Sequence, residues 1–219
     1  MCNRYVTPDE AAMERYWQVG SDNPWRGQQE VFPRGAGPFV RAVPGSHDHE
    51  RELVVGRWGL IPWFAKTTKL PYSTNNARFE GIETKASFKR SWAHGQRCII
   101  PACSFDEPCW ETGRNVWWRF RRADGVPWGL AGLWNEWTDP ESGEILQTYT
   151  MLTINADEHP LMSRMHKPEP SRSPNGQDKR SVVSIELADV DQWLYGSIGD
   201  IAGLVRPPPV EVIDAAPGH

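Results

Sequence analysis

The start of the chain carries the most specific chemistry in the sequence, because Cys2 follows Met1. Methionine aminopeptidase removes an initial methionine when the next side chain is small, and cysteine meets that condition. The new first residue would carry an α-amine with an ordinary pKa of about 7.7–8.0 beside a thiol with a pKa of about 8.5. Such a 1,2-aminothiol condenses with an aldehyde to an imine, and its thiol then closes a five-membered thiazolidine ring. Cys2 is therefore a candidate nucleophile. The alternative is an ordinary residue at a frayed terminus.

Two further groups of polar residues could support this chemistry. The stretch Asn75-Asn76-Ala77-Arg78-Phe79-Glu80 gathers amides, a guanidinium and a carboxylate. Amides can anchor a phosphate or hold a reacting group, although asparagine is also a common turn former. His159 and His166 lie on a basic segment, and histidine is the natural proton shuttle near pH 7. Either histidine could equally be an ordinary surface residue.

The adjacent acids Asp106 and Glu107 form the last candidate group. A carboxyl group that is buried beside Phe105 and Trp110 would have a raised pKa, which suits a general acid. Two acidic residues in an exposed loop are the alternative interpretation. The sequence alone leaves both open.

A helix near the start would hold the first residues in place. Residues 7–10 (TPDE) predict a helix start, with Thr7 as the N-cap of a capping box. Met13 and Trp17 then fall on one face of this helix, as packing against a core requires. Docking of the helix would pin residues 2–6 inside the body of the protein.

Strands account for most of the other predicted elements. The sequence predicts strands at residues 51–60, 97–101, 115–121, 128–134, 148–154, 181–185 and 210–213, and helices at 83–92 and 187–195. Asp124-Gly125 is typical of a hairpin turn, so the second half is expected to be a meander. Since no repeat or linker interrupts the chain, residues 1–219 are expected to form a single α+β domain of mostly antiparallel strands.

Composition excludes several classes of protein. Hydrophobic residues make up 39% and charged residues 24% of the chain, as in ordinary globular proteins, and the net charge of −4 argues against a surface that coats duplex DNA. The sequence has no signal-like apolar segment and no long apolar run, so we expect a cytoplasmic protein with reduced cysteines and no membrane span. Cys98, Cys103 and Cys109 lack the spacing of a zinc site. No metal and no cofactor are therefore expected.

Together these groups match the order and spacing of a known family. The chain resembles the SOS-response-associated peptidase (SRAP) family, whose members shield abasic sites in single-stranded DNA. The resemblance covers nearly the whole length and rests on Met1-Cys2-x-Arg4, Asn76-Ala77-Arg78-x-Glu80, residues 97–107, His166 and the Trp58–Trp63 motif WGLIPW. It implies a single α+β domain whose mostly antiparallel strands form a barrel-like sheet core, with a few short flanking helices.

The resemblance implies a role for each of four catalytic candidates. Cys2 matches the nucleophile that links covalently to the ring-opened aldehyde of an abasic deoxyribose. Asn76 matches the asparagine that lies beside the N-terminus at the reaction centre. Glu107 matches the acidic proton shuttle, and His166 the histidine that assists the imine and ring-opening steps. His166 fits the family spacing better than His159 does.

The resemblance also implies how DNA is bound. Arg4 and Arg78 match contacts to DNA phosphates, and Trp63 falls in a tryptophan-bearing loop beside the bent strand. The expected partner is single-stranded DNA that contains abasic sites, and a monomer is expected. Local arginine and tryptophan contacts in a narrow groove are compatible with an acidic chain.

The sequence departs from the family pattern at two places. The tryptophan that usually follows the acid is replaced by Pro108. After the histidine, Lys167-Pro168 is followed by an inserted loop in place of the usual x-R-M-P, and Lys179-Arg180 is expected to supply the displaced charge.

Three functions are therefore considered. The first is an abasic-site processing protein that forms a thiazolidine cross-link through Cys2 after Met1 removal, with associated lyase activity. The second is a cysteine-type N-terminal-nucleophile peptidase, which needs an oxyanion hole. The third is a non-enzymatic module that binds single strands and tolerates the loss of Cys2.

Overall fold

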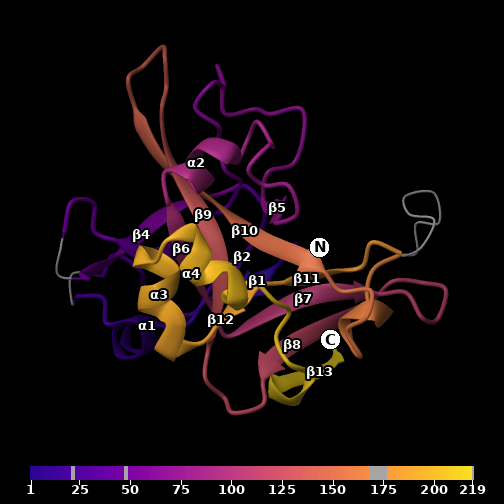
Figure 1. The fold of residues 1–219 in the computed structure, drawn as a ribbon. Coiled ribbons are helices and arrows are strands. Elements are labelled where there is room, and N and C mark those ends of the chain that lie inside the picture. The colour runs from indigo at the N-terminus through magenta and orange to yellow at the C-terminus, as the bar shows by residue number, and fades with distance from the viewer. Residues whose placement is uncertain (21–22, 47–48, 168–176, 219) are drawn as a thin grey trace.

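The computed structural model describes residues 1–20, 23–46, 49–167 and 177–218, and its elements are labelled in Figure 1. The strands are β1 (Tyr5–Val6), β2 (Glu30–Val31), β3 (Ala36–Ala42), β4 (Arg51–Trp58), β5 (Asn76–Arg78), β6 (Arg97–Ala102), β7 (Ser104–Cys109), β8 (Val116–Arg122), β9 (Trp128–Thr138), β10 (Ile145–Asn155), β11 (Arg180–Val182), β12 (Ser184–Ile185) and β13 (Ile213–Pro217). The α-helices are α1 (Glu10–Trp17), α2 (Lys89–Ala93), α3 (Val190–Tyr195) and α4 (Ile198–Ile201). Short 3-10 turns are η1 (Met162–Arg164), η2 (Leu187–Asp189), η3 (Ala202–Leu204) and η4 (Val210–Val212).

A closed mixed barrel forms the centre of the fold. The pairings run from β10 to β4, β3, β6 and β9, and β9 pairs back with β10 to close the ring. The β10–β4 pair is parallel, whereas the other pairs of this ring are antiparallel. Strand β5 adds to β10 in parallel, and β11 and β12 extend the sheet. This arrangement confirms the predicted α+β fold with a barrel-like core of mostly antiparallel strands.

A second sheet, in the order β13-β8-β7-β1-β2, lies against the barrel. Phe105 on β7 stacks on Phe120 of β8, with ring centroids 5.1 Å apart, and also contacts Trp128 at the start of β9. Because Phe105 and Trp128 come from different sheets and both are fully buried, they join the two layers through one apolar core. The short helices cover the outside of the barrel (Figure 1).

Large aromatic side chains fill the core and also satisfy their polar atoms. The indole of Trp58 donates to the carbonyl of Asn75 over 2.8 Å, and that of Trp193 on α3 donates to the carbonyl of Cys98 over 3.0 Å. A buried indole needs such a partner, because its N–H loses water on folding. Trp58 therefore fixes the residue that directly precedes β5, and β5 carries candidate site residues.

Most of the predicted strands are present with small shifts of their ends. The strands predicted at residues 51–60, 97–101 and 148–154 correspond to β4, β6 and β10. The helix predicted at 187–195 is η2 followed by α3, whereas the helix predicted at 83–92 is limited to α2, after a run of turns.

Three local predictions are wrong. Asp9, not Thr7, caps α1 through a bond from the N–H of Ala12, because the Thr7 hydroxyl accepts from the Trp25 indole and from the N–H of Gln29. The turn at residues 124–125 does not make a hairpin, since β8 pairs with β7 and β13 while β9 belongs to the barrel. The strand predicted at 210–213 is η4, and β13 begins where it ends.

The inserted loop after His166 falls mainly on residues 168–176, which lie outside the described residues. Within the described ranges, no helix combines the length and the apolar character needed to cross a membrane.

Candidate active site at the buried N-terminus

The first residues of the chain form the edge of the second sheet. Strand β1 pairs antiparallel with β7, with Tyr5 opposite Phe105, and the N–H of Asp106 donates to the carbonyl of Arg4 over 3.0 Å. Continuing this register carries residues 1–3 along the side of Glu107. Cys2 is consequently fully buried. A frayed terminus, the alternative considered for Cys2, does not describe this arrangement.

Asparagines at the start of β5 hold Cys2 by its backbone. The Asn76 amide donates to the carbonyl of Cys2 over 2.8 Å, and the Asn75 amide approaches the same oxygen at 3.4 Å. Strand β5 is itself fixed by its parallel pairing to β10, with Asn76 opposite Met151. These bonds act on residue 2 itself, so they do not depend on the presence of Met1.

Glu107 and His166 meet beside the amino terminus. The ammonium of Met1 lies 3.1 Å from Glu107 Oε2, and His166 Nε2 lies 2.7 Å from the same oxygen. The Glu107 side chain is 1% exposed and that of His166 is 14% exposed. The structure thus brings together Cys2, Asn76, Glu107 and His166, which are distant in the sequence.

The pKa of Glu107 is lowered, contrary to the raised value expected for a buried acid. Burial alone raises this pKa, but the amino terminus and His166 outweigh that effect through their charges and hydrogen bonds. Glu107 is therefore a carboxylate at neutral pH. It can accept a proton before it donates one.

The thiol of Cys2 behaves in the opposite way. Burial raises its pKa far above the ordinary range, the charge of Glu107 adds to the increase, and a hydrogen bond from the thiol to the Arg4 carbonyl offsets it only in part. Cys2 Sγ lies 3.3 Å from that carbonyl oxygen. The sulfur is therefore a neutral thiol in the resting protein, and it needs a base in order to react.

A buried lysine holds His166 in its position. The backbone of His166 has a φ of 61°, a left-handed conformation that non-glycine residues rarely adopt. Lys179, which is 7% exposed, donates to the carbonyls of Met165 and His166 over 2.6 and 2.8 Å, and the N–H of His166 donates to the carbonyl of Pro108. Burial lowers the pKa of this lysine. The ammonium of Lys179 thus holds the backbone of His166 through a hydrogen bond to its carbonyl.

The second histidine candidate has a structural role. His159 Nδ1 accepts bonds from the N–H groups of Leu161 and Met162, and Nε2 contacts the carbonyl of Pro208. The ring caps the turn that leads into η1. Of the two histidines, His166 is the one that lies beside Glu107.

The guanidinium of Arg4 is engaged inside the protein. It pairs with Asp106, which is 3% exposed in its side chain and also binds Arg119 Nε over 3.0 Å. Asp106 therefore pairs with two arginines, Arg4 and Arg119, and it does not join Glu107 in the site. A contact between Arg4 and a DNA phosphate stays a prediction.

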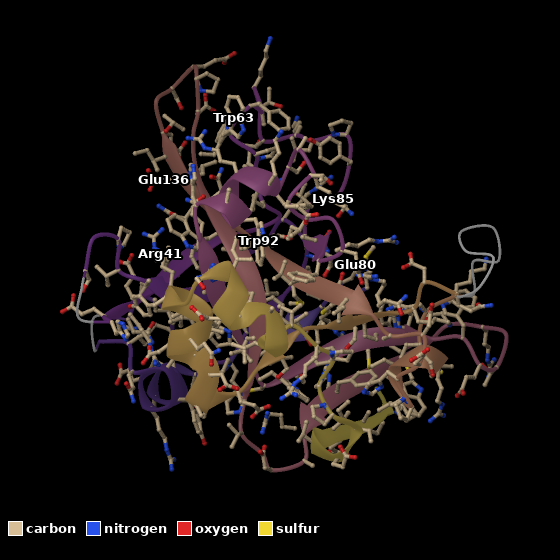
Figure 2. All side chains as sticks on the ribbon, viewed as in Figure 1. Arg41, Trp63, Glu80, Lys85, Trp92 and Glu136 are labelled. Atoms are coloured by element: carbon tan, nitrogen blue, oxygen red, sulfur yellow. The ribbon has the colours of Figure 1, made fainter. Side chains whose placement is uncertain are left out.

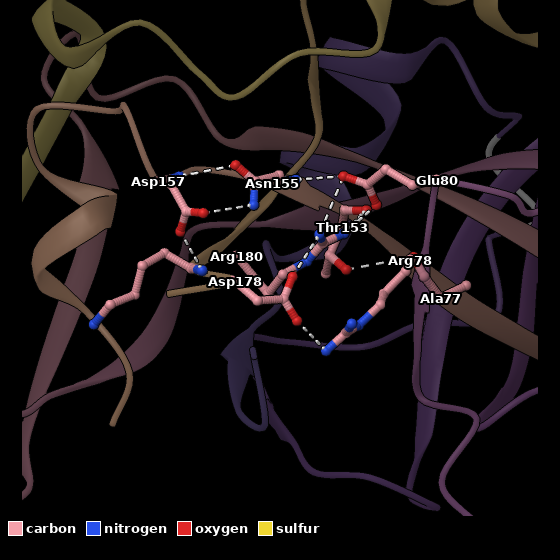
Figure 3. A network of polar contacts seen from close by, with 9 residues as sticks. Ala77, Arg78, Glu80, Thr153, Asn155, Asp157, Asp178 and Arg180 are labelled. Carbon is pink, nitrogen blue, oxygen red and sulfur yellow. Dashed lines mark hydrogen bonds and ion pairs between the residues drawn. The ribbon is translucent and has the colours of Figure 1, made fainter. Parts of the chain in front are cut away.

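Arg78 belongs to the ion-pair network in Figure 3. Its guanidinium lies 2.6 Å from Asp178, which also contacts Arg180, and Arg180 pairs with Glu80 over 2.6 Å. The network ties β5 to the segment before β11. Arg180 supplies its charge to this network rather than to the neighbourhood of His166.

Trp63 lies apart from the catalytic cluster, on the lobe at the top of Figure 2. Its ring is 56% exposed and makes an edge contact with Phe64 at 5.8 Å between centroids. An aromatic ring presented to solvent can stack on a base.

A cavity of about 230 Å³ opens beside the amino terminus. It is lined by Met1, Arg78, Pro108, Trp110, His166 and Lys167, among others. The ammonium of Lys167 lies 5.5 Å from the centroid of the Trp110 ring. An aromatic wall thus remains in the site although Pro108 replaces the usual tryptophan.

Two buried polar atoms of the site have no hydrogen-bond partner among the described residues. They are Asn76 Oδ1 and His166 Nδ1. Because an unpaired buried polar atom is costly, each is available to a group that binds beside it, and His166 lines the cavity. The sequence placed Asn75 among the candidate amides and Lys179 in the displaced basic pair. It did not indicate their contacts with the carbonyls of Cys2, Met165 and His166, which only the fold brings near.

The chain is similar in sequence to proteins of a known family. Residues 1–217 match the family model described as SOS response associated peptidase (SRAP). The chain is similar to the abasic site processing protein HMCES of Xenopus tropicalis, with 28% identity over 166 residues that cover 64% of this chain and 49% of that protein. It is also similar to the abasic site processing protein YoqW of Bacillus subtilis, with 38% identity over 113 residues that cover 50% and 48%. The chain therefore spans about half the length of the curated relatives it matches.

Solved structures agree with the fold. The crystal structure of a Bordetella bronchiseptica protein is similar with a TM-score of 0.84, 35% identity and complete coverage of both chains. A Bacteroides thetaiotaomicron protein gives a TM-score of 0.74 at 20% identity, covering 98% of this chain and 90% of the other, which shows the fold alone.

Replacing Lys179 should destabilise the protein through the backbone of His166. In Lys179→Met the two donated hydrogen bonds are lost, so we expect the free energy of unfolding to fall by about 1–3 kcal/mol. Urea denaturation measures this. The control Lys167→Met removes an exposed lysine twelve positions earlier and should stay within about 0.5 kcal/mol of the wild type. Equal losses in the two variants would refute the positioning role.

Acid should remove the stability that Glu107 provides. Because the pKa of Glu107 is lowered in the folded state, the unfolded chain binds the proton first as pH falls below about 4.3. The difference in unfolding free energy between the wild type and Glu107→Gln should thus shrink as the pH falls below about 4.3. Chemical unfolding at stepped pH checks this. A difference that does not shrink below about pH 4.3 would contradict the lowered pKa.

Proposed function

Because the chain belongs to the SOS response associated peptidase (SRAP) family, we propose that it processes abasic sites in single-stranded DNA by linking to them through Cys2. The observation that carries this proposal is the buried position of Cys2, whose backbone is held by Asn76 beside the Glu107 carboxylate and the His166 ring. An acid–base pair next to a prospective aminothiol is the machinery that condensation with an aldehyde needs.

Removal of Met1 exposes the reacting amine. While Met1 is present, its ammonium forms an ion pair with the carboxylate of Glu107. After its removal the new ammonium belongs to Cys2, which the Asn76 amide holds by its carbonyl. Glu107 is then the nearest base that can take the proton from this amine. Asn76 Oδ1, which has no partner among the described residues, is an acceptor for the same group.

The first bond joins the amine to the sugar. The free amine of Cys2 attacks C1′ of the ring-opened abasic deoxyribose, and the aldehyde oxygen takes up a proton to give a carbinolamine. The C–O bond then breaks as His166 or protonated Glu107 gives a proton to the leaving hydroxyl group, and water departs. The product is an imine between Cys2 and the sugar.

Ring closure uses the thiol. Sulfur attacks the imine carbon, its proton passes to the carboxylate of Glu107, and the imine nitrogen receives a proton in turn. One C–N and one C–S bond form at C1′, and one water is released overall. Because burial raises the pKa of the Cys2 thiol, this step depends on a base. The Glu107 carboxyl group is unprotonated, because its pKa is lowered, and can therefore accept this proton.

The imine also accounts for the proposed lyase activity. An imine at C1′ acidifies the C2′ proton, so a base in the site can remove that proton while the 3′ phosphate leaves. Closure of the thiazolidine withdraws the imine from this reaction. The balance between a stable link and strand cleavage therefore depends on how fast the thiol adds.

The geometry favours cross-linking over general peptidase activity. A peptidase needs a thiolate and hydrogen-bond donors aimed at the carbonyl that is attacked. Here the thiol is neutral, and the amides of Asn75 and Asn76 point to the carbonyl of Cys2 itself. Self-processing would concern the Met1–Cys2 bond, whose carbonyl belongs to Met1.

The three residues expected to bind DNA differ in exposure and in whether their side chains already have partners within the protein. The guanidiniums of Arg4 and Arg78 are half-buried and paired with Asp106 and Asp178, whereas Trp63 is exposed. We propose that Arg78, which lines the cavity, contacts the phosphate next to the abasic sugar. Arg4 orders Asp106 beneath the site and reaches DNA only if that pair opens.

The variant Cys2→Ala tests the C–N bond and the C–S bond of the link separately, because it keeps the amine and removes the thiol. After Met1 removal the substituted chain still begins with an α-amine, so the variant should form an imine that borohydride traps but no link that survives a denaturing gel without reduction. The substrate is a single-stranded oligonucleotide with one abasic site. The control Cys103→Ala, which removes a half-buried thiol outside the site, should cross-link as the wild type does. A heat-stable link in Cys2→Ala would exclude the thiol from the reaction.

A further inference from the structure

A carboxylate lies among the cations of the cavity beside the amino terminus. Asp178 lines this cavity together with Arg78, Lys167 and Arg180, which are all positive. The side chain of Asp178 is 19% exposed. Attraction of a nucleic-acid strand depends on positive charge that meets its phosphates. Asp178 therefore places a negative charge where a phosphate is proposed to bind.

The carboxylate of Asp178 bridges two arginines. Its Oδ2 lies 2.6 Å from a guanidinium nitrogen of Arg78, and its Oδ1 lies 3.3 Å from Arg180. Figure 3 shows both contacts. Because the shorter contact is the one to Arg78, the guanidinium proposed to bind a DNA phosphate already holds an anion of the protein itself.

Arg180 keeps its place without help from Arg78. Its side chain is 5% exposed, pairs with Glu80 over 2.6 Å and donates to the carbonyl of Thr153 over 2.9 Å. Asp178 can therefore release Arg78 while its other oxygen stays beside a fixed cation. Such an exchange keeps the buried Arg180 paired, whereas an unpaired buried charge would be costly.

The backbone also fixes the position of Asp178. Its φ is 51°, a left-handed conformation that aspartate and asparagine adopt more readily than most residues. The N–H of Lys179, the next residue, donates to Asp157 Oδ1 over 2.7 Å. The ammonium of Lys179 binds the carbonyl of His166. The residues that hold the wall of the site thus also hold Asp178 at the cavity.

We infer that Asp178 competes with a DNA phosphate for the guanidinium of Arg78 and thereby weakens the non-covalent hold of the site on a strand. This inference rests on the proposed function. When a strand enters, its phosphate takes the place of Asp178 at Arg78, and Asp178 stays with Arg180. Retention of the strand then depends more on the covalent link to Cys2 than on phosphate contacts.

The opposite role for Asp178 would be to orient Arg78 toward the DNA. The carboxylate would then stay on Arg78 while the phosphate binds to the same guanidinium. Two anions would lie side by side in one cavity, and like charges repel more strongly in a partly buried site than in water. Competition therefore fits the cavity better than orientation does. The two roles predict opposite effects when the carboxylate is removed.

The variant Asp178→Asn removes the charge and keeps a residue that accepts the left-handed backbone. The probe is a single strand of about twenty nucleotides with a central tetrahydrofuran abasic analogue, which has no aldehyde and therefore reports binding alone. Affinity should rise about two- to fivefold, since a partly exposed ion pair no longer has to open. The slope of log K against log salt should become steeper by about 0.7, because Arg78 then neutralises one phosphate without a competing carboxylate.

Three further variants separate this effect from others. In the Arg78→Gln background, Asp178→Asn should give no gain in affinity, because the contested guanidinium is absent. Asp214→Asn removes an exposed acid on β13, outside the cavity, and should bind as the wild type does. Asp178→Gly also removes the carboxylate, and glycine accepts a positive φ. It should repeat the gain of Asp178→Asn, and thermal unfolding should show that each variant is folded.

Unchanged or weaker binding in Asp178→Asn and Asp178→Gly would overturn the inference while leaving the proposed function in place. An equal gain in the Arg78→Gln background, or in Asp214→Asn, would overturn it as well, because a general change of charge would then explain the result. If neither the wild type nor any variant binds the probe, the proposed function fails and the inference fails with it. Since the analogue cannot cross-link, a failure of the Cys2 chemistry alone does not alter these measurements.

Discussion

The burial of the Glu107 carboxylate is the constraint on which the site depends. A carboxylate that is 1% exposed has lost its water, which costs several kcal/mol unless charges and hydrogen bonds replace it. The amino terminus at 3.1 Å and His166 at 2.7 Å replace it here. A buried acid with these neighbours is ionised. Burial of the Cys2 thiol and the charge of Glu107 together raise the pKa of that thiol and keep it neutral.

Each element around Glu107 serves to keep its partners in place. The antiparallel pairing of β1 with β7 carries the first residues past the carboxylate. The insertion of β5 beside β10 brings the Asn76 amide to the backbone of Cys2. Lys179 holds the left-handed backbone of His166. The site is therefore assembled mainly through backbone contacts, and few of its side chains are free to move apart.

The sequence predicted what depends on residue type and local period. Strands such as β4 and β6 follow from alternation, and the grouping of Cys2 with Asn76, Glu107 and His166 follows from the resemblance to the SRAP family. The sequence-based predictions failed where contacts with residues distant in the chain determine the local structure or the pKa. The turn at residues 124–125 passes the chain to another sheet, and the charges near Glu107 reverse the expected direction of its pKa. The carboxylates that engage Arg4 and Arg78 likewise come from distant parts of the chain.

The central claim is that both groups of one residue, the amine and the thiol of Cys2, bond to the same carbon of the abasic sugar. Peptide mapping of the nuclease-trimmed adduct tests it directly, because trypsin cleaves after Arg4 and releases the first residues as a short peptide. The account predicts a peptide that begins at Cys2, lacks Met1, carries the sugar with loss of one water, and has a sulfur that iodoacetamide no longer alkylates. A modified peptide that retains Met1, or one whose thiol is still alkylated, would contradict it.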